Sequence, residues 1–572
     1  MSPVSTNPFS LMTLRRTILS SAGCVFIAAL SGCGGGSDSP PPDTATKSTN
    51  SCDNLAGIQI PASAIGLPTT GGQVTAATLM PASGTGIGSI PEYCRVDASL
   101  HPVDTTAPDI KLAVALPTTW NNKALMIGGG GYDGVIPAVA AADALWFLPG
   151  VSSPLSRGYA TYGSNSGHDR KVGADGKLIP SGFDASFAMN DEALRNYQGD
   201  ALKKTHDAAM FLIQARYGKA PQHSFFAGGS TGGREALLVA QRWPQDFNGV
   251  ISAAPAWNHG AILLDFGRMT RIFSKPGAWP NQAKQKLIYD AVISACDGLD
   301  GATDGIVSNQ SACKFDPHVL RCPSGIDSGD TCLADAQIDA MISASSPMKL
   351  NYPLASGETG YAGWRFLAGG TITAKYEGMN AKQPANPIPQ SYDTMVYAPT
   401  WQEQVRYVIT RDPAYDALTL DPESPGQWQQ RISDLSTRED ANNPDLSPFA
   451  NRGGKLLLIH GAADMWVSAL STEEYWKRVQ TTMGISAVRN FARFYEVPGA
   501  NHQPGVGAPF DPSWDGVKAL EAWVEHGQAP QNLVATDVNA GANRSRPLCD
   551  FPTWPKFTGG DMNQAGNFSC VN

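Results

Sequence analysis

The sequence predicts an α/β protein with a mostly parallel sheet flanked by helices. Residues 224–229 and 249–254 are short apolar runs typical of buried strands, and a helix-forming segment, 234–242, separates them. Strands that alternate with helices favour a parallel sheet covered on its faces. Three further apolar runs have the same strand character: 123–127, 455–459 and 492–497.

A Gly-x-Ser-x-Gly pattern centred on Ser230 follows the first of these strands. This is the pattern of the nucleophile elbow of α/β-hydrolases, a tight turn that lifts a serine hydroxyl out of the sheet. An ordinary Gly/Ser turn is the alternative, but the order strand, turn, helix, strand favours the elbow. The residues that leave room for the turn are Gly228, Gly229, Gly232 and Gly233.

An elbow serine needs a base and an oriented acid, which in this fold follow it in the order acid, then histidine. Asp464 lies on the loop after one predicted strand, and His502 on the loop after the next. We therefore predict a triad of Ser230, Asp464 and His502. The alternatives are a plain loop histidine at 502 and a helix-capping role for Asp464. His460 would then compete as base, although it precedes the acid.

The oxyanion of an acyl-transfer intermediate needs two backbone N–H donors. Thr231, the residue after the nucleophile, supplies one, and the glycine run 128–131 after the strand at 123–127 fits the loop that supplies the other. A flexible glycine turn is the alternative for this run.

The N-terminal segment predicts export. Arg15 and Arg16 precede a mostly apolar stretch, 17–30, which is too short to span a bilayer and ends in Leu-Ser-Gly-Cys33. We predict a lipoprotein signal at residues 1–33, lipidation of Cys33 and a flexible linker at 34–50. A plain secretory signal is the alternative, and the export route, general or twin-arginine, stays open. The protein is then a bacterial lipoprotein, periplasmic or anchored in the outer membrane, with secretion as an alternative.

The charge of the chain limits the kinds of partner that we expect it to bind. A net charge of −9 and the absence of a long basic run argue against nucleic acid. Membrane contact is expected only through the lipid anchor, and the oligomeric state stays open.

Outside the signal segment the number of cysteines is even, as a disulfide framework requires, and nearest-neighbour pairing would close four separate loops. These residues are Cys52, Cys94, Cys296, Cys313, Cys322, Cys332, Cys549 and Cys570.

Three carboxylates crowd into one short loop, at Asp297, Asp300 and Asp304. Like charges this close repel one another unless a cation lies among them, and oxygen donors on a glycine-containing loop suit calcium. A solvated Asp/Gly turn is the alternative. A bound ion would be structural, because the loop is far in sequence from the elbow.

Together these segments resemble the tannase and feruloyl esterase family of α/β-hydrolases, which includes the mono(2-hydroxyethyl) terephthalate hydrolases. The likeness runs from about residue 51 to the C-terminus. It is carried by Gly-Gly-Ser230-Thr-Gly-Gly-Arg-Glu, residues 243–250, Ala253-Ala-Pro255, residues 296–306, His460-Gly-Ala-Ala-Asp464, Pro498-Gly-Ala-Asn-His502 and Arg546-Pro-Leu-Cys549.

The resemblance implies a hydrolase domain in two parts, 51–255 and 450–572, with a large inserted lid domain at 256–449. It implies that Gly131 is the second oxyanion donor. It also implies structural Ca²⁺ held by the side chains of Asp297, Asp300 and Asp304 and by the carbonyls of Ala302 and Ile306.

One departure stands out. Family members usually carry a cysteine before the nucleophile and another after the histidine, which link the two catalytic loops; here these positions are Gly229 and Gln503. Such a disulfide contributes about 2–4 kcal/mol, so we expect the His502 loop to be softer or held by packing.

The expected activity is that of an exported serine carboxylesterase acting on small-molecule esters of aromatic acids, of the feruloyl, caffeoyl or galloyl type. Between Arg365 and Arg406 the only cations are Lys375 and Lys382, so a grip on a free terephthalate carboxylate is not expected. The alternatives are phthalate-type or aliphatic oligoesters, a peptidase of the same fold, and a non-catalytic ligand-binding lipoprotein. Aromatic residues of the predicted lid could stack on the acyl group: Trp364, Phe366, Tyr376, Tyr392, Tyr397 and Trp401.

Overall fold

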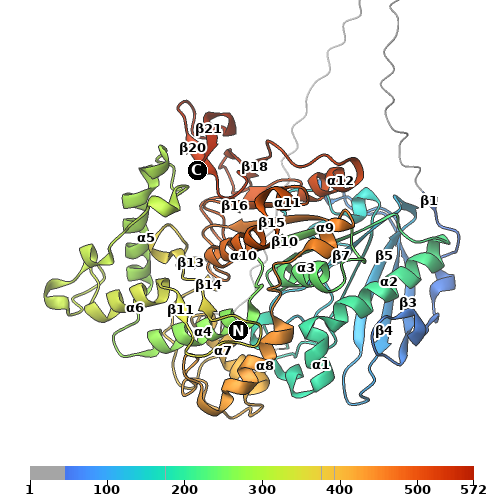
Figure 1. The fold of residues 1–572 in the computed structure, drawn as a ribbon, viewed down its shortest axis with the longest axis horizontal. Helices are drawn as coiled ribbons and strands as arrows, with labels where there is room; N and C mark the ends of the chain where they lie inside the picture. The colour runs from blue at the N-terminus through green and yellow to red at the C-terminus, as the bar shows by residue number, and fades with distance from the viewer. Residues whose placement is uncertain (1–45, 174–175, 375–376, 392) are drawn as a thin grey trace, which may run out of the picture. The chain divides into compact units, whose positions relative to one another are not determined.

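A ten-stranded mixed sheet forms the centre of the fold (Figure 1). The computed structural model describes residues 46–173, 176–374, 377–391 and 393–572. The predicted signal segment and the first part of the predicted linker lie outside these residues. The strands of the sheet run in the order β16 (Ala492–Val497), β15 (Lys455–Gly461), β10 (Gly249–Ala253), β9 (His223–Gly229), β7 (Lys123–Ile127), β8 (Ala160–Ser164), β5 (Ile110–Pro117), β4 (Tyr93–His101), β3 (Gly71–Met80) and β2 (Gln59–Ile60).

The strands from β16 to β8 are parallel, and those from β5 to β2 are antiparallel. The predicted mostly parallel sheet is therefore confirmed for the half that carries the elbow. All five predicted strands are present, and the predicted helix at 234–242 is α3 (Thr231–Arg242), which begins immediately after Ser230.

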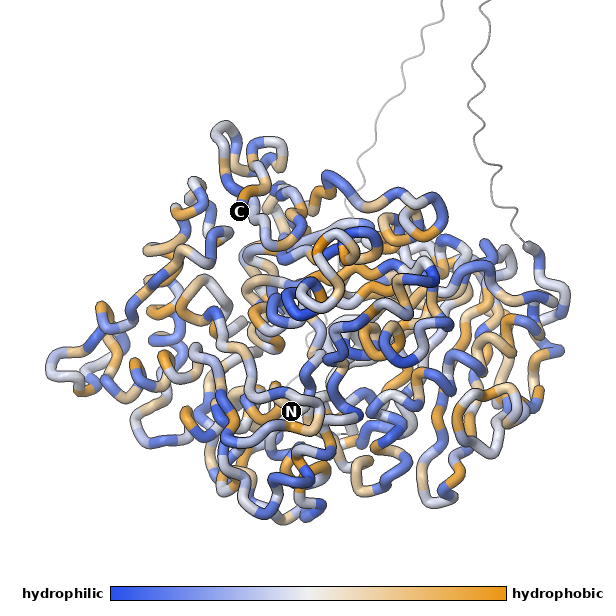
Figure 2. Tube along the Cα trace, in the orientation of Figure 1, coloured by the Kyte–Doolittle hydropathy of each residue, from blue (hydrophilic) through white to orange (hydrophobic). Residues whose placement is uncertain are grey.

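Side chains alternate between the two faces of the sheet. Phe226 and Val250 pack in a core with α3 and with α2 (Ala201–Tyr217), whereas Phe225 and Ile251 pack in a second core with α12 (Gly516–His526). This alternation follows from the two-residue period of a strand. Figure 2 shows hydrophobic residues along these central strands. Both faces are therefore buried, as parallel sheets require.

Most of the buried apolar residues between β10 and β15 pack in a third core, to which Met465, Val467 and Val506 also contribute. In Figure 1 its helices α5 and α6 lie on the opposite side from β3 and β4. The boundaries of a lid domain at 256–449 stay a prediction. The helices of this segment are α4 (His259–Ser274), α5 (Gln282–Cys296), α6 (Asp335–Ser345), α7 (Tyr397–Glu403), α8 (Gln429–Glu439) and α9 (Ser447–Asn451).

Shorter elements complete the fold. The end of the predicted linker forms β1 (Thr46–Lys47), which pairs with β6 (Thr119–Trp120). The other helices are α1 (Asp191–Arg195), α10 (Ala469–Met483) and α11 (Ile485–Arg489). The remaining strands are β11 (Met348–Lys349), β12 (Gly360–Tyr361), β13 (Thr373–Ala374), β14 (Glu377–Gly378), β17 (Pro512–Ser513), β18 (Val534–Asp537), β19 (Ser545–Pro547), β20 (Trp554–Phe557) and β21 (Phe568–Val571).

Among the described residues, no helix is both long and apolar enough to cross a membrane.

The structure has the nearest-neighbour pairing of the cysteines. The disulfides are typical of proteins from oxidising compartments. They join Cys52 to Cys94, Cys296 to Cys313, Cys322 to Cys332, and Cys549 to Cys570.

A buried ion triplet joins the segment between β10 and β15 to the central sheet. Arg365 donates to Glu473 of α10 and to Glu496 of β16, and all three side chains are mostly buried. Without this cation Glu496 would be buried and unpaired, which is costly, and Glu473 would keep only its pair with the exposed Lys477 at 2.8 Å.

We expect Arg365→Ala to lower the free energy of unfolding by about 3–5 kcal/mol, because it leaves Glu496 buried without a cation and Glu473 with Lys477 as its one cation among the described residues. Chemical denaturation measures this. Arg321→Ala is the control, since Arg321 forms an exposed pair with Asp335, and its removal should leave the melting temperature unchanged. Equal effects of the two variants would contradict the assignment.

Candidate functional site

Ser230 lies in the turn between β9 and α3, and its backbone is strained. Its φ of 63° and ψ of −123° are rare for a residue with a side chain. Such a conformation costs about 1–3 kcal/mol and persists only where its surroundings enforce it. The Ser230 amide donates to the Ala253 carbonyl at 3.0 Å, which ties the turn to the end of the neighbouring strand.

The glycines of the elbow are required by close backbone approach. A Cβ atom on Gly228 would lie 2.3 Å from the Gly232 carbonyl oxygen, and one on Gly233 would lie 2.3 Å from the Ala253 carbonyl oxygen. Any larger residue would push α3 away from the strands. The predicted tight turn is therefore present, with Ser230 half-buried at its tip.

The structure brings Asp464 and His502 together. They lie on the loops after the neighbouring parallel strands β15 and β16, so both project from the same edge of the sheet. His502 Nδ1 and Asp464 Oδ2 are 2.7 Å apart. Asn501 supports the loop, because its side-chain oxygen accepts the amides of His502 at 2.8 Å and of Met465 at 3.3 Å.

Asp464 is held ionised. Its side chain is fully buried, and burial alone would raise its pKa. The hydrogen bonds and charges of His502 and His460 outweigh burial, so the pKa of Asp464 lies well below its usual range. Its other oxygen accepts the amides of Trp466 and Val467 at 2.7 and 2.9 Å.

His460, the competing base, lies on the far side of the acid. Its side chain is fully buried. Its Nδ1 lies 2.8 Å from the Thr472 hydroxyl and its Nε2 lies 3.2 Å from Asp464. Buried in this way, His460 can orient Asp464 but cannot reach an ester at Ser230.

Within the described residues, the Ser230 hydroxyl makes no hydrogen bond to another side chain. Contacts between nucleophile and base are often long in structures without substrate. The triad therefore stays a prediction, in which the Asp464–His502 pair is already assembled. Ser230 and Trp466 line one cavity, and the Trp466 ring centre is 6.4 Å from that of His502.

Gly131 and Thr231 lie beside Ser230 in the same cavity. The Thr231 hydroxyl donates to the Gly131 carbonyl at 2.7 Å, and the Tyr197 hydroxyl donates to it at 3.2 Å. These bonds fix the peptide of Gly131, whose φ is 59°. Neither the Gly131 nor the Thr231 amide donates to another described residue, so both remain available for an oxyanion.

A buried acid pair, which the sequence reasoning missed, supports this loop. Glu235 accepts the Gly129 amide at 3.0 Å, and burial together with the charge of Asp133 raises the pKa of Glu235 far above its usual value. Burial also raises the pKa of Asp133. Burial thus favours the protonated form of both carboxyl groups. The acidic residue at position 235, in the helix that follows the elbow, was the available signal.

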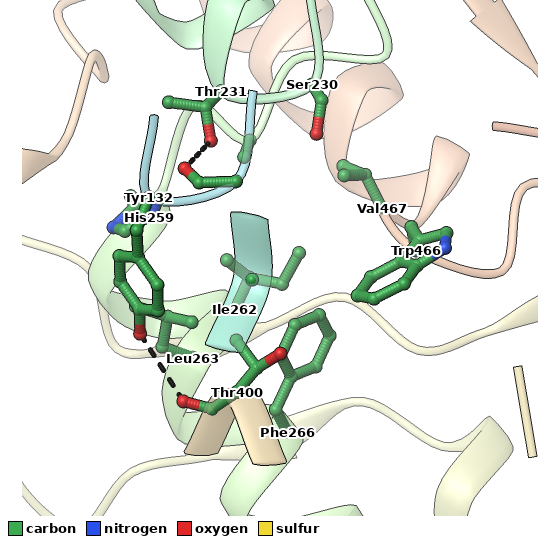
Figure 3. Close-up of a pocket in the computed structure, with 13 residues that line it drawn as sticks. Tyr132, Ser230, Thr231, His259, Ile262, Leu263, Phe266, Thr400, Trp466 and Val467 are labelled. Carbon is green, nitrogen blue, oxygen red and sulfur yellow. Dashed lines mark hydrogen bonds between the residues drawn. The ribbon is translucent and has the colours of Figure 1, made fainter. Parts of the chain in front are cut away.

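The cavity next to Ser230 is apolar (Figure 3). The Ser230 hydroxyl faces a space bordered by Ile262, Leu263 and Phe266 of α4 and by Trp466. Among the described residues, no Lys, Arg, Asp or Glu lines it. His259 does, but burial lowers its pKa, so it is neutral there and bonds the Tyr197 hydroxyl.

Comparison with known proteins identifies the family. The profile described as "Tannase and feruloyl esterase" matches residues 94–571. The chain belongs to this family. It is 37% identical to an uncharacterized esterase of Agrobacterium fabrum, over 91% of this chain and 93% of that one. It is 29% identical to the mono(2-hydroxyethyl) terephthalate hydrolase of Piscinibacter sakaiensis, over 84% and 85% of the two chains.

Solved structures share the fold of this tannase and feruloyl esterase family member. Feruloyl esterase B from Aspergillus oryzae superposes with a TM-score of 0.71 at 23% identity, over 91% of this chain and all of that one. The tannin acyl hydrolase of Aspergillus niger gives a TM-score of 0.64 at 21% identity, over 87% and 90% of the two chains. The predicted α/β-hydrolase fold is confirmed, and the relatives make the chain a carboxylic ester hydrolase.

The predicted stacking aromatics of this family member lie elsewhere. Trp364, Phe366, Tyr397 and Trp401 are buried in the core of the segment between β10 and β15 and do not line the Ser230 cavity. Tyr376 and Tyr392 lie outside the described residues. The aromatic rings that do line the cavity belong to Tyr132, Phe266 and Trp466. Sequence alone could not separate these residues from core positions, because both are apolar.

The cations considered for a free carboxylate are engaged. Arg365 belongs to the buried ion triplet, and Arg406 donates to the Tyr415 carbonyl at 3.0 Å. Lys382 forms an exposed pair with Asp393 at 3.1 Å. Lys375 lies outside the described residues.

The aspartate loop offers donors of the type that calcium binds, but they are already engaged. Asp297 accepts the amides of Asp304, Gly305 and Ile306, and Asp300 accepts those of Ala302 and Ser308. Arg546 donates to Asp304. Burial and the charge of Asp304 raise the pKa of Asp300, and a cation would oppose this shift. Calcium held by Asp297, Asp300, Asp304 and the carbonyls of Ala302 and Ile306 stays a prediction.

A different acidic group gathers more closely in the described part of the chain. His206, Asp207 and Asp246 have ligand atoms within 4.8 Å of one another. Lys203 lies 2.8 Å from Asp207 and 2.9 Å from Asp246, so an ammonium group already neutralises these carboxylates. This cluster is an ion-pair network.

If the aspartate loop binds calcium, a chelator should lower the melting temperature, and calcium should restore it. The reason is that a ligand bound only to the folded state stabilises it. Calorimetry and elemental analysis of the purified protein test this, with Asp300→Asn as the variant that loses the response. An unchanged melting curve with no metal found would contradict the calcium site.

Proposed function

We propose that this chain is a serine esterase that cleaves esters of aromatic acids through a covalent acyl-enzyme. The observation that carries the proposal is the hydrogen-bonded Asp464–His502 pair, on the same sheet edge as a strained elbow serine. An apolar cavity with two unengaged amides adjoins that serine.

In the acylation step the Ser230 oxygen attacks the ester carbonyl and its proton passes to His502 Nε2. Asp464 accepts a hydrogen bond from the Nδ1–H group of His502, which selects the tautomer whose Nε2 carries the lone pair of the base. The amides of Gly131 and Thr231 receive the negative charge that develops on the carbonyl oxygen. Collapse of the intermediate breaks the ester bond, and the imidazolium proton goes to the leaving alcohol.

In the deacylation step water replaces the alcohol. His502 takes a proton from the attacking water, the acyl–serine bond breaks, and the proton returns to the Ser230 oxygen. The products are a carboxylic acid, an alcohol and the regenerated enzyme. Asp464 stays ionised throughout because its pKa is low.

The lining of the cavity favours a substrate whose acyl group is aromatic and uncharged. Phe266 and Trp466 offer rings, and flat apolar surfaces favour stacking. Relatives include proteins named as feruloyl esterases, which agrees with this choice. An acyl group with a free carboxylate would be buried without a cation among the described lining residues.

We further infer that the protein works outside the cytoplasm. The four disulfides support this placement. A lipid on Cys33, tethered by the residues between it and β1, would hold the enzyme at a membrane surface. Mass spectrometry of the mature N-terminus distinguishes this form from a secreted one.

Ser230→Ala should reduce kcat by about 10⁴-fold or more, because it removes the nucleophile. Asp464→Asn should reduce kcat by about 10³–10⁴-fold, because it allows the wrong tautomer of the His502 imidazole. Ester hydrolysis and labelling by an organophosphonate probe measure both. Melting curves serve as the control for folding. Labelling absent from the unaltered protein would favour a non-catalytic binding role.

Esters with a neutral aromatic acyl group should be better substrates than those with a second, ionised carboxylate. The matched pair is the diester and the half-ester of terephthalate. We expect kcat/KM to be about 10- to 100-fold higher for the diester, since a buried polar group without a partner costs about 1–3 kcal/mol. Equal rates would show that a cation reaches the acyl group.

A further inference from the structure

One indole ring, that of Trp146, contacts both loops of the proposed triad. It lies on the long connection between β7 and β8. On one side it meets the elbow, since a Cβ atom on Gly229 would lie 2.7 Å from Trp146 Cζ2. On the other side its ring centre is 5.9 Å from that of His502, at an interplanar angle of 45°.

The contact with the elbow explains the glycine before the nucleophile. Gly229 has an ordinary negative φ, so its backbone does not demand glycine. Glycine is required here for steric reasons, because the Trp146 indole occupies the space that a Cβ atom at position 229 would need. A second ring, Phe147, lies 3.0 Å from the same point. The position that usually carries a cysteine in this family is therefore closed by Trp146.

The contact of Trp146 with His502 restricts the tilt of the imidazole ring, which the hydrogen bond to Asp464 does not fix. The hydrogen bond to Asp464 holds Nδ1, but the imidazole can still tilt about that bond. Trp146 packs on the ring, and Trp466 lies near it at 6.4 Å and 43°. Two indoles this close to the imidazole limit its tilt and so influence where Nε2 points.

The Trp146 ring is presented from a fixed base. Its neighbours Leu145 and Leu148 are buried in the core beneath the sheet. The Leu148 amide donates to the Leu145 carbonyl at 2.8 Å, and the Ser513 hydroxyl donates to the Pro149 carbonyl at 2.6 Å. Trp146 itself is only half-buried, so the short segment 145–149 is anchored independently of it.

We propose that Trp146 is a positioning residue that holds the His502 imidazole toward the elbow, by packing where related enzymes use a covalent link. The inference rests on the proposed function, because it assumes that His502 is the base for Ser230. It assigns to Trp146 an effect on the rate of the chemical step and no contact with the acyl group, since Trp146 does not line the Ser230 cavity.

The test compares Trp146→Ala with Phe147→Ala. Both variants remove a ring that packs on Gly229, but only the first removes the Trp146 ring that lies 5.9 Å from the His502 ring. We expect Trp146→Ala to lower kcat by about 100-fold, the cost of a misplacement of about 1 Å, with KM changed less than about threefold. Organophosphonate labelling of Ser230 should slow in parallel. Phe147→Ala should keep kcat close to that of the unaltered enzyme.

Melting curves separate positioning from stability. If both variants lose stability equally but only Trp146→Ala loses kcat, the proposal holds. If kcat is retained in Trp146→Ala, or falls equally in both variants, the proposal is overturned. Should Trp146→Ala fail to fold, Trp146→Phe takes its place, with an intermediate loss of kcat expected and full activity counting against the proposal. Ser230→Ala is run beside them: if it stays active, the proposed function fails, whatever the Trp146 variants do.

Discussion

The strained backbone of Ser230 is the constraint on which the rest of the site depends. A residue with a side chain holds φ near 63° only if its surroundings leave it no alternative. Here α3 and the strands approach so closely that Gly228 and Gly233 have no room for a Cβ atom. The central parallel strands supply that rigidity, because both of their faces are buried. The sheet thus stabilises a turn that would not persist in isolation.

Around this turn, the polar groups are held by one another. The Gly131 carbonyl accepts two hydroxyls, and the carboxyl of Glu235 accepts the Gly129 amide. The amides of Gly131 and Thr231 donate to no other described residue. In the proposed mechanism a donor pair of this kind needs no reorganisation when charge develops.

The base is held differently from the nucleophile. Asp464 fixes one nitrogen of His502, and aromatic rings border its faces. Packing forces are individually weak and tolerate small shifts better than a covalent link does. The loss of the cysteine pair at Gly229 and Gln503 is then compatible with an ordered site, because the indole of Trp146 occupies the space beside the elbow. In the proposed arrangement, Trp146 adds to the support that Asn501 and Asp464 give the His502 loop.

The sequence by itself determined the family, the α/β class, the elbow and the order of the proposed triad, because these depend on local patterns: apolar runs, a glycine-flanked serine, and polar residues just after strands. The spacing of the cysteines favoured nearest-neighbour disulfides without fixing them, and the structure has this pairing. Only the tertiary structure decided which aromatic residues meet the cavity. Trp364 and Phe266 look alike in the sequence and pack in the same core, yet only Phe266 also borders the Ser230 cavity. The same holds for Trp146 and for the raised pKa values of Asp133 and Glu235, since contacts between distant segments depend on how helices and loops pack on the sheet, and no local pattern records that packing.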